Sequence, residues 1–299
     1  MAEATLSEQR SSLSAAQLAA RHGLHVAAER PSIPAYLRQL WAYRHFMTAY
    51  SSAKMSAQYA NVGLGQLWQV LTPLANAAVY GLIFGLVLKT SHGIPNFIGY
   101  LCIGVFIYTF TASTVQGSVK SITDNLGLIR ALHFPRATLP LTVTLTQVQQ
   151  MIASTSVLLV ILLITGESPS WKWLLLVPSL LLQAVFNAGL AMFLARAGSK
   201  VTDLKQLMPF MMRTWLYGSG IFYSISIFTD HLGPTLGRIF LLNPLLVFAS
   251  LPRELLMENP PGHPMSEPEQ WLIGLAWAVV ALVIGFVYFW RGEKEYGRG

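Results

Sequence analysis

The chain has 299 residues, of which 53% are hydrophobic and only 11% are charged, and its mean hydropathy is +0.49. An average soluble domain carries about 25% charged residues, which it needs to cover its surface. The composition therefore excludes an ordinary soluble globule and predicts an integral membrane protein. The net charge of +7 does not indicate nucleic-acid binding, because the basic residues are scattered along the flanks of apolar segments.

Two segments precede the first strongly apolar stretch. Residues 1–33 are rich in Ala, Ser, Glu and Arg and lack a continuous apolar run, so they predict a mobile cytoplasmic tail and not a signal peptide. Residues 34–54 predict an amphipathic helix on the cytoplasmic membrane surface, because tyrosines recur there every seven residues. The pattern fits a membrane anchor and also a docking surface for a partner protein, and the two roles are compatible. The recurring tyrosines are Tyr36, Tyr43 and Tyr50, and Trp41 lies on the neighbouring stripe.

Residues 55–295 contain six apolar stretches of the length that a helix needs to cross the hydrocarbon core. We expect all six to be helical, because open strands would leave backbone groups unsatisfied in lipid. The sequence thus predicts an all-α integral membrane protein with six transmembrane helices. The expected spans cover residues 64–88, 96–119, 137–165, 173–194, 206–228 and 271–290.

A seventh apolar run, residues 239–251, is too short to span the membrane and is interrupted by Asn243 and Pro244. A broken segment can lie at membrane depth only where protein or water covers its freed backbone groups. We therefore expect a re-entrant helical hairpin on the external side, at about residues 239–257, between spans five and six.

Orientation follows from the flanks of the six spans. Most of the 20 Lys and Arg residues fall on flanks that share one side of the membrane. The positive-inside rule places that side in the cytoplasm, together with both termini.

The connection between the second and third spans, residues 120–136, has apolar residues at helical spacing and a Phe-Pro-Arg sequence at its end. A merely solvated loop would have no need for Leu128, Ile129 and Phe134. We expect a short amphipathic helix that ends before Pro135. A helix held between two spans is suited to receiving a push from a cytoplasmic partner.

This connection also carries a family resemblance. Residues 125–141, NLGLIRALHFPRATLPL, resemble the Asn-x-x-Leu-Ile-x-x-x-x-Phe-Pro-Arg-x-x-Leu-Pro segment of permease subunits of ABC exporters for O-antigen, capsule, galactan and teichoic acid. Three further matches occur in the expected order, although Thr202 stands where the family usually has Arg. They are Leu64 to Trp68 followed by Pro73, Thr202 to Gln206, and Leu242 to Pro244 followed by Arg253.

The resemblance, which covers about residues 35–295, implies a type-2 ABC exporter of the bacterial inner membrane. Its permease subunits form a homodimer that works with two copies of a separate ATPase, and the substrate is a polyprenyl-diphosphate-linked glycan. ATP and Mg²⁺ are expected on the partner ATPase, because this chain has no Gly-x-x-x-x-Gly-Lys-Ser/Thr loop to cradle phosphates. No cofactor is expected on the chain itself.

In that family the loop helix between spans two and three contacts the ATPase, and the resemblance implies a second contact for the surface helix. The implied coupling residues are Tyr36, Trp41, Tyr43, Asp124, Asn125, Leu128, Ile129, Arg130, Phe134 and Arg136. The residues that match the external re-entrant segment are Asn243, Pro244 and Arg253.

Polar residues inside the spans recur on shared helical faces, which indicates either a wet path or interhelical hydrogen bonds. Aromatic and amide side chains would let a glycan slide without firm binding, although tyrosines near span ends also serve as interface anchors. Arg213 either faces the path, where it would attract a diphosphate, or extends to the cytoplasmic headgroups. The candidate path residues are Gln66, Gln69, Asn76, Tyr80, Tyr108, Arg213, Tyr217, Phe222 and Tyr223.

We therefore expect the membrane subunit of an exporter for a galactan, teichoic acid or O-antigen. One alternative is an exporter of the same architecture for a small lipid or drug, and another is a membrane-embedded glycolipid-modifying enzyme. An enzyme would need acids or a metal site within the spans. The single cysteine, Cys102, and the dispersed histidines give no sign of either, so no catalytic residue and no metal site are expected.

Overall fold

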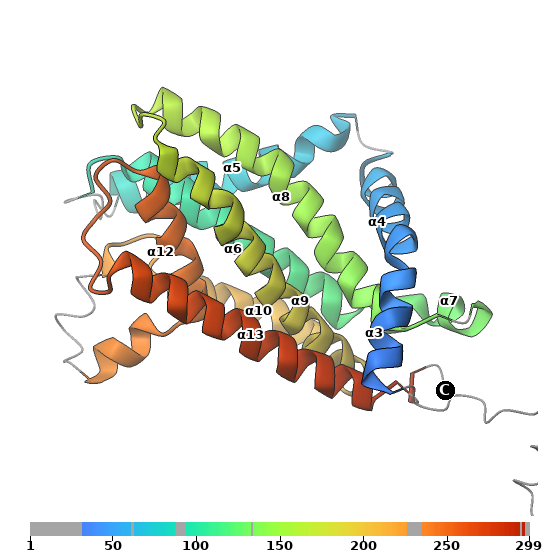
Figure 1. Ribbon diagram of the computed structural model, residues 1–299. Coiled ribbons are helices and arrows are strands. Elements are labelled where there is room, and N and C mark those ends of the chain that lie inside the picture. Colours follow the sequence, from blue (N-terminus) through green and yellow to red (C-terminus); the bar gives the residue numbers. More distant parts are fainter. Residues whose placement is uncertain are drawn as a thin grey trace, which may run out of the picture.

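A computed structural model describes residues 32–60, 63–87, 94–132, 134–225, 235–293 and 295–296. Every regular element within these ranges is a helix, as Figure 1 shows. The predicted all-α membrane fold is confirmed. The expected N-terminal tail lies outside the described residues, apart from its last two positions.

Five helices are long and apolar enough to cross a membrane. Their bounds follow the predicted spans closely, because long charge-free stretches fix them. The first combines α5 (Trp68–Tyr80) with a π-helical continuation, Gly81–Val87. The others are α6 (Phe97–Val119), α8 (Thr138–Ile164), the 3₁₀ turn Trp171–Leu175 with α9 (Leu176–Lys200), and α13 (Glu267–Arg291).

The predicted fifth span differs from the structure. A continuous helix over residues 206–228 was expected, but α10 (Leu204–Tyr217) has only 14 residues. That length corresponds to about 21 Å, which is less than the roughly 30 Å of hydrocarbon. The helix ends at Gly218, and Gly220 adopts a left-handed φ of 62°. The prediction of one continuous helix was therefore wrong, because this glycine pair turns the backbone out of the helix.

The broken segment expected between the fifth and sixth spans is present. Helix Thr235–Leu241 and α12 (Pro244–Leu256) meet at 73°. Asn243 lies at the break, where its side chain accepts a hydrogen bond from the Leu245 backbone N–H (3.1 Å). Most of α12 is buried against α6, α9 and α13, so protein covers the backbone groups that the break sets free.

The surface helix predicted over residues 34–54 is two helices. They are α3 (Ile33–Ala42) and α4 (Arg44–Tyr59), which meet at Tyr43. Tyr36 and Leu40 on α3 are buried, whereas Trp41 is 70% exposed. The expected single helix ending at residue 54 is corrected to a broken pair that reaches Tyr59.

The bundle is built around α6, which is the most buried of the long helices. Helix α9 packs on α6, and α13 runs side by side with α9 (Figure 1). Gly189 and Gly285 permit this packing, because a Cβ on either glycine would collide with the backbone of the opposite helix.

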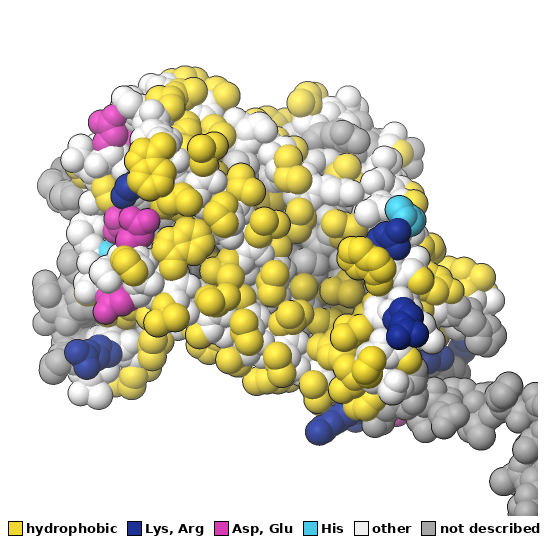
Figure 2. Space-filling model, viewed as in Figure 1, with side chains coloured by type: hydrophobic (Ala, Val, Ile, Leu, Met, Phe, Trp, Pro, Cys, Tyr) yellow, Lys and Arg dark blue, Asp and Glu magenta, His cyan; other side chains and the backbone are white. Residues whose placement is uncertain are grey.

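Figure 2 shows an apolar belt between two charged ends. Lys and Arg side chains gather over α3 and α4 at one end, and acidic side chains gather at the other. The first described helix and the residues after α13 meet at the basic end, through Tyr36 and Glu293. We call this the α3 end of the molecule.

Candidate functional site

A buried carboxylate joins three parts of the chain at the α3 end. The Tyr36 hydroxyl donates to Glu293 Oε2 at 2.7 Å, and the Arg136 backbone N–H donates to Oε1 at 3.0 Å. Arg136 Nη1 also donates to the Glu293 carbonyl at 2.8 Å, and the Ala137 N–H donates to the Tyr36 hydroxyl at 3.2 Å. This arrangement, the Glu293 junction, ties α3 and the start of α8 to the segment that follows α13.

The electrostatics of the junction reflect its burial. Burial raises the pKa of the Glu293 carboxyl, and the donors from Arg136 and Tyr36 partly oppose that shift. Burial also raises the pKa of the Tyr36 hydroxyl well above its ordinary value, and the nearby Glu293 charge acts in the same direction. Tyr36 therefore remains a hydrogen-bond donor, which is the role that Glu293 requires.

The connection between the second and third spans contains the predicted short helix. A 3₁₀ turn, Thr123–Asn125, leads into α7 (Leu126–Ala131), which ends before Pro135. The Tyr50 hydroxyl on α4 donates to Asn125 Oδ1 at 2.9 Å. The Phe46 ring stacks on Tyr50 and lies 5.9 Å from the Phe134 ring. Helix α4 and the loop around α7 are thus packed together.

All ten coupling candidates lie at the α3 end, but they differ in exposure (Figure 1). Tyr36 and Ile129 are buried and hold elements together. The half-buried members are Tyr43, Asn125, Leu128, Phe134 and Arg136, and the exposed members are Trp41, Asp124 and Arg130.

The candidate path residues fall in two different places. One is an aromatic cluster around Phe222, which is fully buried. Its ring stacks on Phe84 at 4.3 Å and lies 4.7 Å from Tyr80 and 5.7 Å from Tyr217. The Tyr223 hydroxyl donates to the Tyr217 carbonyl at 2.6 Å.

Arg213 and Tyr108 lie beside this cluster. Arg213 is exposed on α10, and its charge acts on Tyr80 and on Tyr108, which is half-buried on α6. Helices α5, α6 and α10 therefore contribute these side chains to one neighbourhood.

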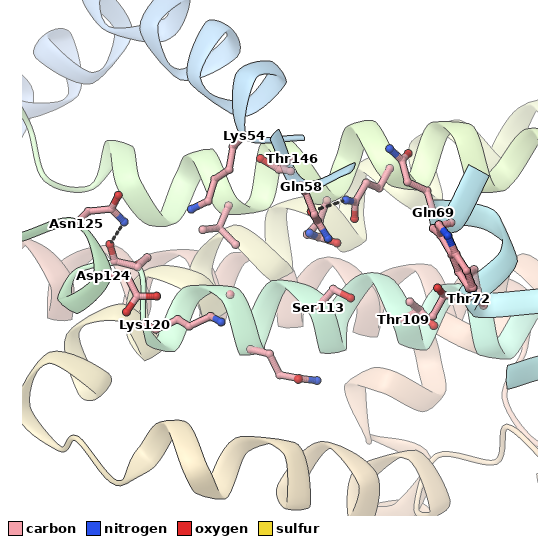
Figure 3. Close-up of a pocket in the computed structure, with 18 residues that line it drawn as sticks. Lys54, Gln58, Gln69, Thr72, Thr109, Ser113, Lys120, Asp124, Asn125 and Thr146 are labelled. Carbon is pink, nitrogen blue, oxygen red and sulfur yellow. Dashed lines mark hydrogen bonds between the residues drawn. The ribbon is translucent and has the colours of Figure 1, made fainter. Parts of the chain in front are cut away.

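The second place is a polar cavity of about 530 Å³ between α4, α5, α6 and α8 (Figure 3). Gln69 lines it, whereas Asn76 is exposed outside it. The side chain of Gln66 lies outside the described residues. Other polar residues on the cavity wall are Gln58, Thr72, Thr109, Ser113, Gln116, Thr146, Gln147 and Gln150.

Two of the three candidates of the broken segment, Asn243 and Arg253, bind backbone carbonyls at and just after the end of α10. Asn243 accepts from Trp215 Nε1 at 2.7 Å and donates to the Gly218 carbonyl at 2.8 Å. Pro244 begins α12. Arg253 is buried and donates to backbone carbonyls of Tyr100, Gly220 and Ile221.

Sequence patterns alone did not identify several residues of these sites. Glu293 stands among the charges of the C-terminal segment and has no motif, while Lys54 and Lys120 were counted only as span flanks. The change from apolar to polar residues along the faces of α5, α6 and α8 was the available signal for the cavity that these lysines line. Among the described residues, no group of three or more His, Cys, Asp or Glu side chains is placed to hold a metal ion.

A known protein family matches most of this chain. Residues 47–256 match the family model described as ABC-2 type transporter. The chain belongs to the ABC-2 type transporter family. The resemblance inferred from the sequence is confirmed.

The chain is also similar to individual relatives. This chain is 25% identical over 248 residues to an O-antigen export system permease protein RfbA of Myxococcus xanthus. That match covers 82% of this chain and 94% of the relative. Two Klebsiella pneumoniae proteins of the same name are 27% and 26% identical, and each match covers 69% of this chain and 77% of the relative. The family match begins within α4, includes α7 and α12, and ends before α13, so Glu293 lies outside it.

Proposed function

We propose that the chain is the membrane subunit of an ABC exporter for an O-antigen-type polysaccharide. The substrate is carried on a polyprenyl diphosphate and moves from the cytoplasm to the outer face of the bacterial inner membrane. One observation carries this proposal: the similarity spans 94% of the length of a permease named for O-antigen export. The family match over residues 47–256 includes both the region around α7 and the broken segment before α13.

In this proposal the α3 end lies in the cytoplasm, with both termini. Two observations support that orientation. Lys and Arg side chains gather over α3 and α4 (Figure 2), as the positive-inside rule requires of a cytoplasmic face. The hydrogen bond between Tyr36 and Glu293 brings the two ends of the described chain to the same face.

A homodimer of this chain works with two copies of a separate ATPase, which bind ATP and Mg²⁺. This chain supplies no phosphate-cradling loop of its own. The ATPase contacts the exposed side chains Trp41 and Arg130 near α3 and α7. Its movement passes from α7 to α4 through Asn125 and Tyr50, and to α8 and α13 through the Glu293 junction.

The glycan passes along the neighbourhood of the aromatic cluster. Tyr80 and Tyr217, which pack against the buried Phe222 ring, offer flat apolar surfaces for the C–H faces of sugars. Arg213 lies on the same surface and attracts the diphosphate during passage. Little of the first span is buried within one chain, which leaves its outward faces available to the second copy and to lipid.

Co-expression with the candidate ATPase from the same genome tests this proposal. Arg130→Glu and Phe134→Ala should each lower copurification of the ATPase or its ATP turnover in the complex. Arg238→Glu is a matched control, because it reverses a charge on an exposed residue far from α7. Failure of the unaltered chain to bind any ATPase, or unchanged coupling in both variants, would contradict the proposal.

A further inference from the structure

The polar cavity between α4, α5, α6 and α8 has the size of a head-group site. Its volume of about 530 Å³ falls within the roughly 300–1,000 Å³ of small-molecule pockets. A polymer does not fit in such a space, whereas a diphosphate with its first sugar does. The cavity is therefore suited to one end of a lipid-linked substrate.

The charges are concentrated at one end of the cavity. Figure 3 shows Lys54 and Lys120 near Asp124 and Asn125, with Gln69 and Thr72 toward the other end. Burial lowers the pKa of the Lys54 ammonium, the Lys120 charge lowers it further, and Asp124 opposes both. Lys54, Lys120 and Asp124 are exposed where they line the cavity, so two ammonium groups stand near one carboxylate at this end, and the excess positive charge favours the binding of an anion.

Most of the remaining wall residues are uncharged and polar, and such groups are costly inside an apolar bundle unless they face a ligand or one another. Gln150 Nε2 donates to Gln58 Oε1 at 3.4 Å. The Gln69 amide nitrogen is buried and has no hydrogen-bond partner among the described atoms. Amide and hydroxyl groups of this kind suit the hydroxyl groups of a sugar.

The lipid side of the cavity is apolar. Trp68 belongs to the wall and is 40% exposed, and Leu67 and Leu71 beside it on the first span are also exposed. A prenyl chain can lie against these side chains in the bilayer while its head group enters the cavity.

We propose that this cavity is a loading site for the head group of a polyprenyl-diphosphate-linked glycan. Lys54 and Lys120 bind the diphosphate, Gln69 and its polar neighbours bind the first sugar, and the prenyl chain stays in the lipid beside α5. The identity of the substrate rests on the proposed function. Asp124 and Asn125 line the cavity and precede α7 directly, so occupation of the site is transmitted to the ATPase contact.

Binding of undecaprenyl diphosphate to the purified permease–ATPase complex, in nanodiscs of phosphatidylcholine, tests the site. The double variant Lys54→Ala/Lys120→Ala should weaken binding by about tenfold or more, because hydrogen bonds to charged groups are lost. It should also abolish stimulation of ATP hydrolysis by the ligand. Lys205→Ala is the matched control, because Lys205 is an exposed lysine on α10 outside the cavity wall, and it should leave both readouts unchanged.

Three further probes separate the sources of the binding energy. Inorganic diphosphate should compete with the lipid, whereas undecaprenol should not bind appreciably. If phosphatidylglycerol competes as effectively as undecaprenyl diphosphate, the lysines form a general lipid anchor and the proposal is overturned. Equal binding by the double variant and the parent, with both complexes eluting as intact particles, overturns it as well.

A sugar-bearing probe tests the remaining wall. Gln69→Leu should weaken binding of an undecaprenyl diphosphate that carries one sugar, but not of the sugar-free lipid. An equal effect on both lipids, or no effect on either, overturns the assignment of Gln69 to the sugar.

The site and the proposed function can fail separately. If the complex binds undecaprenyl diphosphate through Lys54 and Lys120 but surface polysaccharide does not depend on this chain, the function fails and the site stands. If surface polysaccharide depends on the chain but the double variant binds and responds like the parent, the site fails and the function stands.

Discussion

The guanidinium of Arg253 lies against Tyr100. Nε and Nη2 donate to the Tyr100 carbonyl at 3.2 and 3.1 Å, and the guanidinium carbon lies 3.4 Å from the centroid of its ring. The same side chain donates to the carbonyls of Gly220 and Ile221, both at 3.0 Å. These carbonyls belong to the segment that follows the end of α10. Arg253 therefore replaces the helical hydrogen bonds that are lost where the fifth span breaks.

Arg253→Met should destabilise the protein strongly. The change removes the Arg253 donors from three buried carbonyls. Because the Gly220 carbonyl keeps the Tyr100 hydroxyl at 2.8 Å and the Tyr100 carbonyl lies within α6, the main cost, about 1–3 kcal/mol, falls on the Ile221 carbonyl. Arg253→Lys should have an intermediate effect, because an ammonium lacks the planar fork of donors. Thermal unfolding of the purified protein in detergent measures the loss of stability in each variant. Arg238→Met, at an exposed position, is the control. An unchanged melting temperature for Arg253→Met would show that the carbonyls have other partners.

Gly104→Ala should disturb the same contact from the opposite side. A Cβ at this position would collide with Arg253 Nη2 and lie 3.0 Å from Ile221 Cγ2, so the guanidinium would have to move. We expect a loss of about 1–3 kcal/mol in unfolding free energy. Gly262→Ala is the control, because nothing lies within 4 Å of its Cβ. Equal melting temperatures for the two variants would contradict this packing.

The sequence was sufficient to predict features that depend on hydropathy, but it was not sufficient to predict those that depend on hydrogen-bond partners in the folded structure. The predicted span over residues 96–119 and the helix α6 nearly coincide, because a long charge-free run fixes both ends. The early end of α10 was missed, although Gly218 and Gly220 are a local signal for it. Arg253 was matched to the broken segment, but its partners are backbone carbonyls, which leave no mark in the sequence.

Glu293→Ala should weaken the attachment of α3 to the bundle. It removes the acceptor of Tyr36 and of the Arg136 backbone N–H, and we expect a cost of about 2–4 kcal/mol. Glu293→Gln should cost less, because the amide oxygen still accepts a hydrogen bond. Limited proteolysis near α3 and thermal unfolding measure the effect. Equal proteolysis of Glu293→Ala and the parent would rule out the junction as an attachment point.

The same residue predicts a pH dependence. Burial raises the pKa of Glu293 above its ordinary value of 4.5, so between these two values the folded state binds more protons than the unfolded state. The contribution of Glu293 to stability should therefore fall as the pH rises from about 4.5 through the raised pKa. Because glutamine does not titrate, the melting temperature of the parent should fall relative to that of Glu293→Gln over that interval. A difference that is constant with pH would contradict the shift.

Tyr50→Phe should impair coupling with little change in stability. The variant loses the hydrogen bond to Asn125, which is worth about 1 kcal/mol, but keeps the stacking on Phe46. ATP turnover in the complex should fall while the ATPase still copurifies. Thr48→Val is the control, because its hydroxyl bonds only within α4. Unchanged turnover in Tyr50→Phe would remove this contact from the coupling route.

The central claim is that the chain exports a lipid-linked surface polysaccharide. The most direct measurement compares a strain that lacks the chain with the same strain complemented by it, scoring polysaccharide at the cell surface and lipid-linked glycan in the inner membrane. We predict that surface polysaccharide is lost without the chain, that lipid-linked glycan accumulates on the cytoplasmic face, and that complementation reverses both. Unchanged surface polysaccharide in the deletion strain would contradict it.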